Sequence, residues 1–190
     1  MALAQPFTTQ SQAIASYNFT DVADGTGVLV FFGTRTRTDS AITYRLITDT
    51  THSEEINTNG SADLDFDLTA FNLPRVAKGT AFVSVPVSAL GGGDSITVAC
   101  QLRKWDGSSE TNITSVITSE TYTNQTKMVF MALPITEHNF ASGDVLRLNV
   151  TTTVGGSSGN TGLGHDPAGR DILSMDTTVL KLLMPFKIDI

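Results

Sequence analysis

Apolar residues occupy every second position near the C-terminal end of the chain. Charged Lys181, Lys187 and Asp189 lie between them, and the apolar set is Leu180, Leu182, Met184, Phe186, Ile188 and Ile190. In an extended strand, a period of two places one set of side chains on one face and the other set on the opposite face. The pattern therefore predicts a half-buried β-strand over residues 180–190.

Further strand candidates recur along the whole chain. Alternating segments lie at 64–68, 96–102 and 146–150, and continuous apolar runs lie at 28–32, 42–47, 81–87 and 128–133. Turns rich in Gly, Asp and Asn separate these segments. Together they predict about eight to ten strands, the number expected of an antiparallel two-sheet sandwich. We expect an all-β fold with jelly-roll topology, and an immunoglobulin-like sandwich is the alternative.

Length and composition fit one all-β domain. The chain has 190 residues, of which only 16% are charged, and it is rich in Thr and Gly. Such a composition favours strands and turns over helices, and the length suits a single core. We expect one β-sandwich domain over 1–190. Residues 1–20 would form an N-terminal arm with the first strand, and 154–177 would form a long loop insert.

The charge balance excludes some classes of partner. Lys and Arg number 12 against 19 Asp and Glu, which gives a formal net charge of −7. Nucleic-acid backbones and anionic lipids attract basic surfaces, so we expect no nucleic-acid partner and no membrane partner. The sequence shows no secretion signal and no membrane-spanning run, and the single Cys100 excludes an intrachain disulfide. We therefore expect synthesis in a cytoplasm.

No residue pattern predicts catalysis, a metal site or a cofactor. His52, His138 and His165 lack the spacing and the Cys partners of a zinc site, and we interpret them as surface histidines. Asp166 and Arg170 follow His165, but no Gly-x-Ser-x-Gly nucleophile motif accompanies them. We interpret this segment as a turn in which Arg170 bonds an aspartate through both nitrogens and orders the loop. We expect the chain not to be an enzyme, and a hydrolase centred on His165 and Asp166 is a minor alternative.

Three aspartates alternate with apolar residues in one predicted strand. Asp63, Asp65 and Asp67 have the spacing of the first positions of a calcium loop, but the Gly and distal Glu of such a loop are missing. On one strand face the three carboxylates would repel one another. We interpret them as a solvated acidic face, and binding of a cation or of a basic partner there stays open.

Two aromatic residues and two arginines are further candidates for binding. Trp105 and Tyr122 could stack on a sugar ring, as aromatic platforms do in sandwich domains that bind glycans. Arg35 and Arg37 would lie on the same side of an extended segment and form a small basic spot on an acidic protein. We keep the first pair for a carbohydrate-binding alternative and the second pair as interface candidates.

Several phrases resemble small virion structural proteins of tailed bacteriophages. These phrases lie at 14–21, 25–27, 102–107, 140–148, 165–170 and 184–188. The resemblance implies a jelly-roll capsid decoration (cement) protein on the virion surface. It also implies binding to the major capsid protein of a phage head, usually as a homotrimer, without enzymatic activity.

Under this hypothesis the interface candidates lie in the N-terminal arm and the basic spot. They are Phe7, Ile14, Tyr17, Arg35 and Arg37. Residues 102–148 also look like binding-module sandwiches outside phages. The alternative function is therefore a carbohydrate-binding module or a receptor-binding fibre tip, with Trp105 and Tyr122 as its platform.

Overall fold

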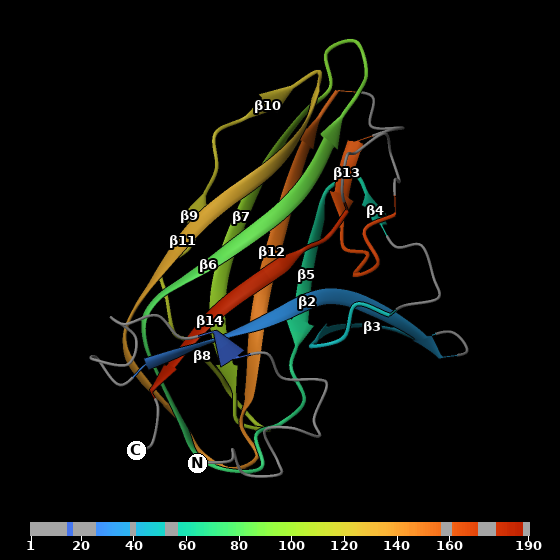
Figure 1. Cartoon of the computed structure of the whole chain (residues 1–190). Helices are drawn as coiled ribbons and strands as arrows, with labels where there is room; N and C mark the ends of the chain where they lie inside the picture. Colours follow the sequence, from blue (N-terminus) through green and yellow to red (C-terminus); the bar gives the residue numbers. More distant parts are fainter. Residues whose placement is uncertain are drawn as a thin grey trace.

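The fold is all-β, as expected. A computed structural model describes residues 15–16, 26–38, 41–51, 57–156, 161–170 and 178–187, and these form fourteen strands (Figure 1). All fourteen strands are hydrogen-bonded into one sheet. Among the described residues, no helix has the length and apolar character needed to cross a membrane.

Eight strands have six or more residues, at the lower end of the expected number. They are β2 (Thr26–Thr38), β3 (Ala41–Ile47), β5 (Ala62–Asp67), β6 (Arg75–Ala89), β7 (Ser95–Trp105), β11 (Gln125–Phe140), β12 (Val145–Gly155) and β14 (Lys181–Lys187). The short ones are β1 (Ala15–Ser16), β4 (Asn57–Asn59), β8 (Glu110–Asn112), β9 (Ile117–Thr118), β10 (Tyr122–Thr123) and β13 (Thr161–Gly164). Strands of two to four residues are too short to show a period of two in the sequence.

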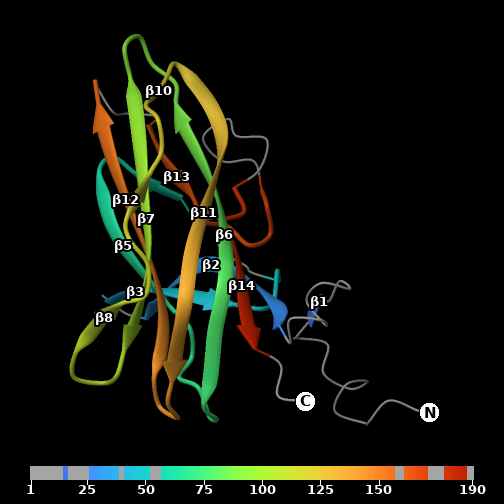
Figure 2. The ribbon, with the colours of Figure 1, turned by 90° about the vertical axis from the view of Figure 1, so that its left-hand side faces the viewer.

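The sheet folds over into two facing layers, which Figure 2 shows nearly edge-on. One layer, the β6 layer, has the strand order β2-β14-β6-β11, and the other, the β7 layer, has the order β5-β12-β7. Strand β3 joins them, because it pairs with β2 along its length and meets β5 at the Arg45–Asp67 bridge. Apart from that single parallel bridge, every pairing is antiparallel. The predicted antiparallel β-sandwich is confirmed, but its two layers belong to one continuous sheet.

The chain crosses between the layers repeatedly. It runs from β2 in the β6 layer to β5, returns to β6, crosses to β7, returns to β11, crosses to β12 and ends in β14. This order supports the jelly-roll topology, which stays a prediction.

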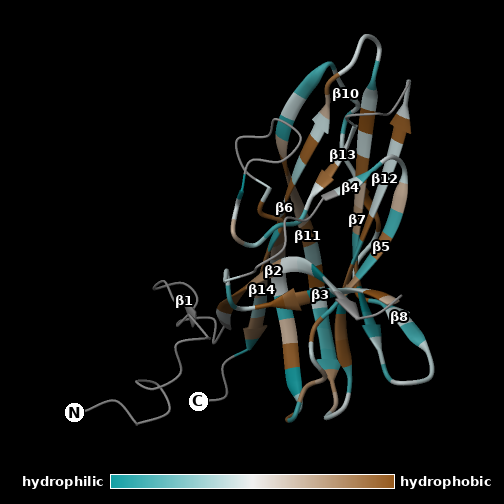
Figure 3. Cartoon of the chain, turned by 90° about the vertical axis from the view of Figure 1, so that its right-hand side faces the viewer, coloured by the Kyte–Doolittle hydropathy of each residue, from teal (hydrophilic) through white to brown (hydrophobic). Residues whose placement is uncertain are grey.

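The hydrophobic core lies between the two layers. Strand β6 contributes Val83 and Val85, and β7 contributes Val98 and Leu102, all at most 1% exposed. Figure 3 shows hydrophobic segments in strands of both layers and hydrophilic ones in the loop beside β8. Cys100 is also buried here, and burial raises the pKa of its thiol, so it is an unreactive core residue.

The alternating C-terminal pattern is confirmed where the structure describes it. Leu180, Leu182, Met184 and Phe186 are each at most 3% exposed. Lys181 and Lys187 alternate with them and are partly exposed. Residues 188–190 lie outside the described residues.

The predicted loop insert at 154–177 is partly wrong. Strand β12 extends to Gly155, and β13 forms a bridge between β6 and β4. Gly162 permits this close approach, because a Cβ atom there would meet the carbonyl oxygen of Thr58. A strand with two glycines and one large apolar residue carries no alternation, so the sequence pattern missed it. Of the N-terminal arm, the structure describes only β1, whose Ala15 and Ser16 pair with β2.

Candidate functional site

The outward side of the β6 layer is apolar where a sandwich usually presents polar residues. Two rows of cross-strand partners run across it, Phe130–Ser84–Lys181–Phe32 and Ala132–Phe82–Leu183–Val30. Cross-strand partners point to the same side of a sheet. We call Val30, Phe32, Phe82, Phe130, Ala132 and Leu183 the outer apolar face.

Two aromatic side chains dominate this face. Phe130 on β11 is 78% exposed and Phe82 on β6 is 54% exposed. Val129, Met131 and Val83 precede or follow them in the chain and are buried on the other side. These strand segments are thus apolar on both sides, with one side in the core and the other in solvent.

The continuous apolar runs in the sequence already indicate strands that are apolar on both sides. The runs at 28–32, 81–87 and 128–133 fall on β2, β6 and β11, which belong to one layer. The alternating segments at 64–68, 96–102 and 146–150 form the other layer, but the alternating segment at 180–186 is β14 of the β6 layer, and the continuous run at 42–47 is β3, which joins the layers. Alternation marks a sheet with one solvated polar side, whereas continuous runs mark strands covered on both sides.

A depression opens in the outer apolar face. Its volume is about 450 Å³, and its lining residues are Phe32, Thr50, Ser84, Met128, Phe130, Pro167, Val179 and Lys181. The ammonium nitrogen of Lys181 lies 5.8 Å from the centroid of the Phe32 ring, within cation–π range. The depression therefore combines aromatic and aliphatic walls with one positive charge.

The outward side of the β7 layer is polar and internally paired. Arg147 on β12 donates from Nε and Nη2 to the two carboxylate oxygens of Asp67, at 2.7 and 2.9 Å. Its Nη1 also lies 3.1 Å from Glu110. The hydrogen bond to Asp67 raises the pKa of Arg147, and the nearby acidic charges add to this effect.

The other two aspartates of β5 belong to the same network. The Nδ2 of Asn149 donates to Asp63 at 2.7 Å and to Asp65 at 2.9 Å. Arg103 lies 3.7 Å from Asp65 and 3.0 Å from Glu110. The three aspartates face solvent, as the sequence predicted, but they do not form an unpaired acidic face, because arginines on β12 and β7 pair with Asp65 and Asp67. Within the described ranges, no cluster of three or more His, Cys, Asp or Glu side chains could hold a metal ion.

The turn after β13 is built as the sequence predicted. Arg170 donates from Nε and Nη2 to both carboxylate oxygens of the fully buried Asp166, at 2.6 and 3.0 Å. The backbone N–H of Ala168 donates to the same carboxylate, and the N–H of Gly169 donates to the Asp166 carbonyl. The predicted bidentate pair is confirmed.

His165 is not a surface residue, which corrects the sequence-based interpretation. It is fully buried, and its ring packs edge-on against Tyr44 and Phe66 at centroid distances of 5.6 Å. Nε2 lies 2.9 Å from the Oγ1 of Thr58. Burial and, to a smaller extent, the positive charge of Arg35 lower the pKa of His165 to about 3. His165 is therefore a neutral imidazole in the core. We call the pair of rings that it contacts, Tyr44 and Phe66, the aromatic box.

The other two histidines differ from each other in placement. His138 is partly buried beside Phe140, with ring centroids 5.5 Å apart, and burial lowers its pKa. His52 lies outside the described residues.

The proposed sugar platform does not form. Tyr122 is 8% exposed and pairs with Ile96 at the start of β7, whereas Trp105 is the last residue of that strand. An eleven-residue strand is about 35 Å long, so the two rings lie at opposite ends of the layer. The Trp105 ring is already occupied by the guanidinium of Arg147, 5.6 Å from its centroid.

The interface candidates are only partly placed. Phe7, Ile14 and Tyr17 lie outside the described residues, as does the side chain of Arg37. Arg35 lies on β2, close enough to His165 to lower its pKa, and so borders the aromatic box. The sequence candidates therefore do not include the aromatic residues of the outer apolar face.

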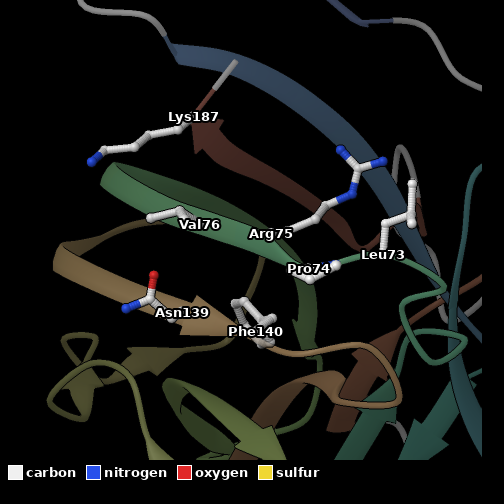
Figure 4. A pocket seen from close by; sticks show the side chains of 7 residues that line it. All are labelled: Leu73, Pro74, Arg75, Val76, Asn139, Phe140 and Lys187. Carbon is white, nitrogen blue, oxygen red and sulfur yellow. The ribbon is translucent and has the colours of Figure 1, made fainter. Parts of the chain in front are cut away.

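A second pocket of about 330 Å³ lies between the start of β6, the end of β11 and the end of β14 (Figure 4). Arg75 and Lys187 line it, but their side chains point in different directions. Lys187 is paired with Glu137 at 2.9 Å, and the Arg75 guanidinium lies 6.0 Å from the Phe186 ring centroid. The two cations do not converge on one ligand position.

Comparisons with known proteins add little to this picture. No protein-family profile matches the sequence, and no curated protein matches it either. The chain is similar to an alpha-amino acid ester hydrolase with a TM-score of 0.39 and 15% identity, over 65% of this chain and 24% of that one. It is similar to an aminopeptidase from the marine sediment archaeon Thaumarchaeota archaeon with a TM-score of 0.47 and 8% identity, over 81% of this chain and 34% of that one.

These neighbours correct one expectation. Both are hydrolases, which contradicts the sequence-based expectation that the chain is not an enzyme, and we withdraw that expectation. Because both TM-scores are below 0.5, the likeness assigns neither a reaction nor a catalytic residue to this chain. The chain also spans only 24% and 34% of the length of these two proteins.

Proposed function

We propose that this chain is a virion structural protein that binds and stabilises the head of a tailed bacteriophage as a decoration protein. The observation that carries the proposal is the outer apolar face, with Phe130 78% and Phe82 54% exposed on neighbouring strands. Soluble monomers rarely expose a contiguous apolar patch unless it binds something. The resemblance of several phrases to phage virion proteins supports the capsid of such a head as the partner.

The sheet architecture suits attachment to a lattice. The four strands of the β6 layer are hydrogen-bonded side by side, so the outer apolar face is held in place before binding. A preorganised surface binds without the entropic cost of ordering loops. Exposed aromatic residues are also the side chains that most often dominate binding energy at interfaces.

A homotrimer on the major capsid protein is part of the proposal. Three linked copies would present three outer apolar faces, so modest contacts of each copy would add up to firm attachment. Cytoplasmic synthesis followed by assembly onto the head agrees with the single, buried Cys100.

The proposal is tested on particles of the encoding phage produced with the gene for this chain deleted. Labelled protein is added, the particles are sedimented, and the temperature at which the heads release their DNA is recorded. We expect saturable co-sedimentation and a higher release temperature. Failure of the folded protein to sediment with the particles would overturn the proposal.

A further inference from the structure

We propose that the depression in the outer apolar face is the docking site for an apolar side chain of a partner protein that has a carboxylate beside it in the same segment. The inference rests on the proposed function for the identity of the partner, and it adds the chemistry that the site recognises. The site combines the apolar walls of Phe32, Met128 and Phe130 with the ammonium group of Lys181.

The walls favour an apolar anchor. Phe130 and Phe32 stand at the two ends of the row Phe130–Ser84–Lys181–Phe32. Ser84 beside Phe130 is small, which leaves room next to the Phe130 ring, and Lys181 lies between Ser84 and Phe32. An apolar side chain that enters this depression would remove aromatic surface on both sides from water, which contributes roughly 25 cal/mol for each Å² of apolar area buried.

The charge favours an acidic neighbour. Lys181 faces the depression, and its ammonium group interacts with the Phe32 ring, without an ion pair to any described carboxylate. The other two lysines that point outward from this layer, Lys78 and Lys187, are both paired with Glu137. Among the described lysines that point outward from this layer, Lys181 is therefore the one without an ion pair to a described carboxylate.

The described acidic residue that adjoins the lining in the chain is held in its own turn. Asp49 precedes Thr50, which lines the depression, and it accepts hydrogen bonds from the backbone N–H of Thr51 at 2.8 Å and from its hydroxyl. These bonds lower the pKa of Asp49 and hold its carboxylate within its own turn. A carboxylate of the partner would thus interact with the ammonium group of Lys181. This attraction becomes stronger when the bound apolar side chain excludes water.

A peptide selection tests this chemistry directly, because a random library presents every combination of apolar and charged neighbours. The library is selected on the immobilised full chain, and recovered peptides are measured against Phe130→Ser, Lys181→Glu and the matched control Val116→Ser. Val116 is 55% exposed and lies next to β9, on the β7 layer. All three positions are on the surface, so thermal unfolding of the variants should match that of the wild type.

We expect recovered peptides to carry Phe, Leu, Ile or Trp next to Asp or Glu. Phe130→Ser should weaken their binding by about tenfold or more, as expected for an interface aromatic, and Val116→Ser should leave it unchanged. A second selection on Lys181→Glu should recover peptides with Lys or Arg in place of the acid. Non-specific hydrophobic adsorption to an apolar face could not change the preferred charge of the peptides from acidic to basic.

Other outcomes overturn the inference. Recovery of no acidic–apolar sequence, or equal binding to Phe130→Ser, would do so. Self-association of the wild-type protein that Phe130→Ser abolishes would place a second copy on the face instead. The two proposals fail separately. A protein that sediments with particles but selects no such peptide keeps the proposed function and overturns this inference, whereas one that selects such peptides but does not sediment with particles overturns the proposed function.

Discussion

The guanidinium of Arg170 closes on the carboxylate of Asp166 four residues earlier, with both nitrogen–oxygen contacts at or below 3.0 Å. Asp166 has no exposed surface, whereas the Arg170 side chain is 31% exposed. The pair therefore fixes a turn that follows directly on the buried His165. Thr178 strengthens it, because its hydroxyl donates to the Arg170 carbonyl at 2.7 Å.

Removal of this arginine should destabilise the fold. In Arg170→Ala the carboxylate of Asp166 stays buried without its partner, and we expect a loss of about 2–4 kcal/mol in the free energy of unfolding. Chemical denaturation measures it. The exposed pair Lys78–Glu137, at 3.8 Å, provides the control, since Lys78→Ala should change stability by less than about 0.5 kcal/mol. Equal effects of the two variants would contradict the structural role of the turn.

Burial of His165 should make stability depend on pH. Its pKa is lowered to about 3 in the folded state and is about 6.5 when unfolded. Between these values the unfolded chain binds the additional proton, so stability is fully present above pH 6.5 and falls as the pH is lowered towards 3. The slope should approach about 1.4 kcal/mol per pH unit.

His165→Gln should flatten this dependence, because Gln does not titrate. Denaturant unfolding at several pH values measures the slope. His138→Gln serves as the comparison: burial also lowers the pKa of His138, but this residue is only partly buried. A slope unchanged in His165→Gln would contradict the buried neutral imidazole.

Gly162 should tolerate no side chain. A Cβ atom at this position would fall against the backbone of Thr58 and Asn59 on β4, so Gly162→Ala should push β13 and β4 apart and lower stability by about 1–3 kcal/mol. Gly92→Ala is the matched control, because its Cβ atom would have no neighbour within 4 Å. Thermal unfolding that shifts equally in both variants would be the contrary result.

The paired network on the β7 layer should depend on salt once Arg147 is removed. Arg147→Gln removes the arginine that pairs with Asp67 and leaves Arg103 for Asp65 and Glu110, and we expect a loss of about 1–2 kcal/mol at low salt. Screening of the carboxylates in about 1 M salt should recover part of this loss. Lys127→Gln, an exposed residue outside this network, should show neither effect. A loss that salt does not change would argue against electrostatic repulsion as its cause.

Strands and their buried faces were predictable because they depend on local patterning. The alternation at 64–68, 96–102, 146–150 and 180–186 identified β5, β7, β12 and β14 and the residues that each buries. The contact between Arg170 and Asp166 was also predictable, since only three residues separate them. Neither inference depends on which strands are neighbours.

What the sequence could not provide was the register between distant strands. The pairing of Arg147 opposite Asp67 joins residues 80 positions apart, and it turns a stripe of repelling aspartates into a paired network. The same reason applies to His165, whose partner Thr58 is 107 positions away. The outer apolar face combines runs that were visible one by one, but only the order of β2, β14, β6 and β11 makes them a surface.

The central claim is that the outer apolar face attaches this protein to a capsid. Electron cryomicroscopy of heads that lack the chain, with and without the added protein, tests it most directly. The account predicts additional density on the head, fitted by the sandwich with β2, β14, β6 and β11 against the shell and β5, β12 and β7 turned away. Heads without additional density, or a sandwich seated through the Arg147–Asp67 side, would contradict it.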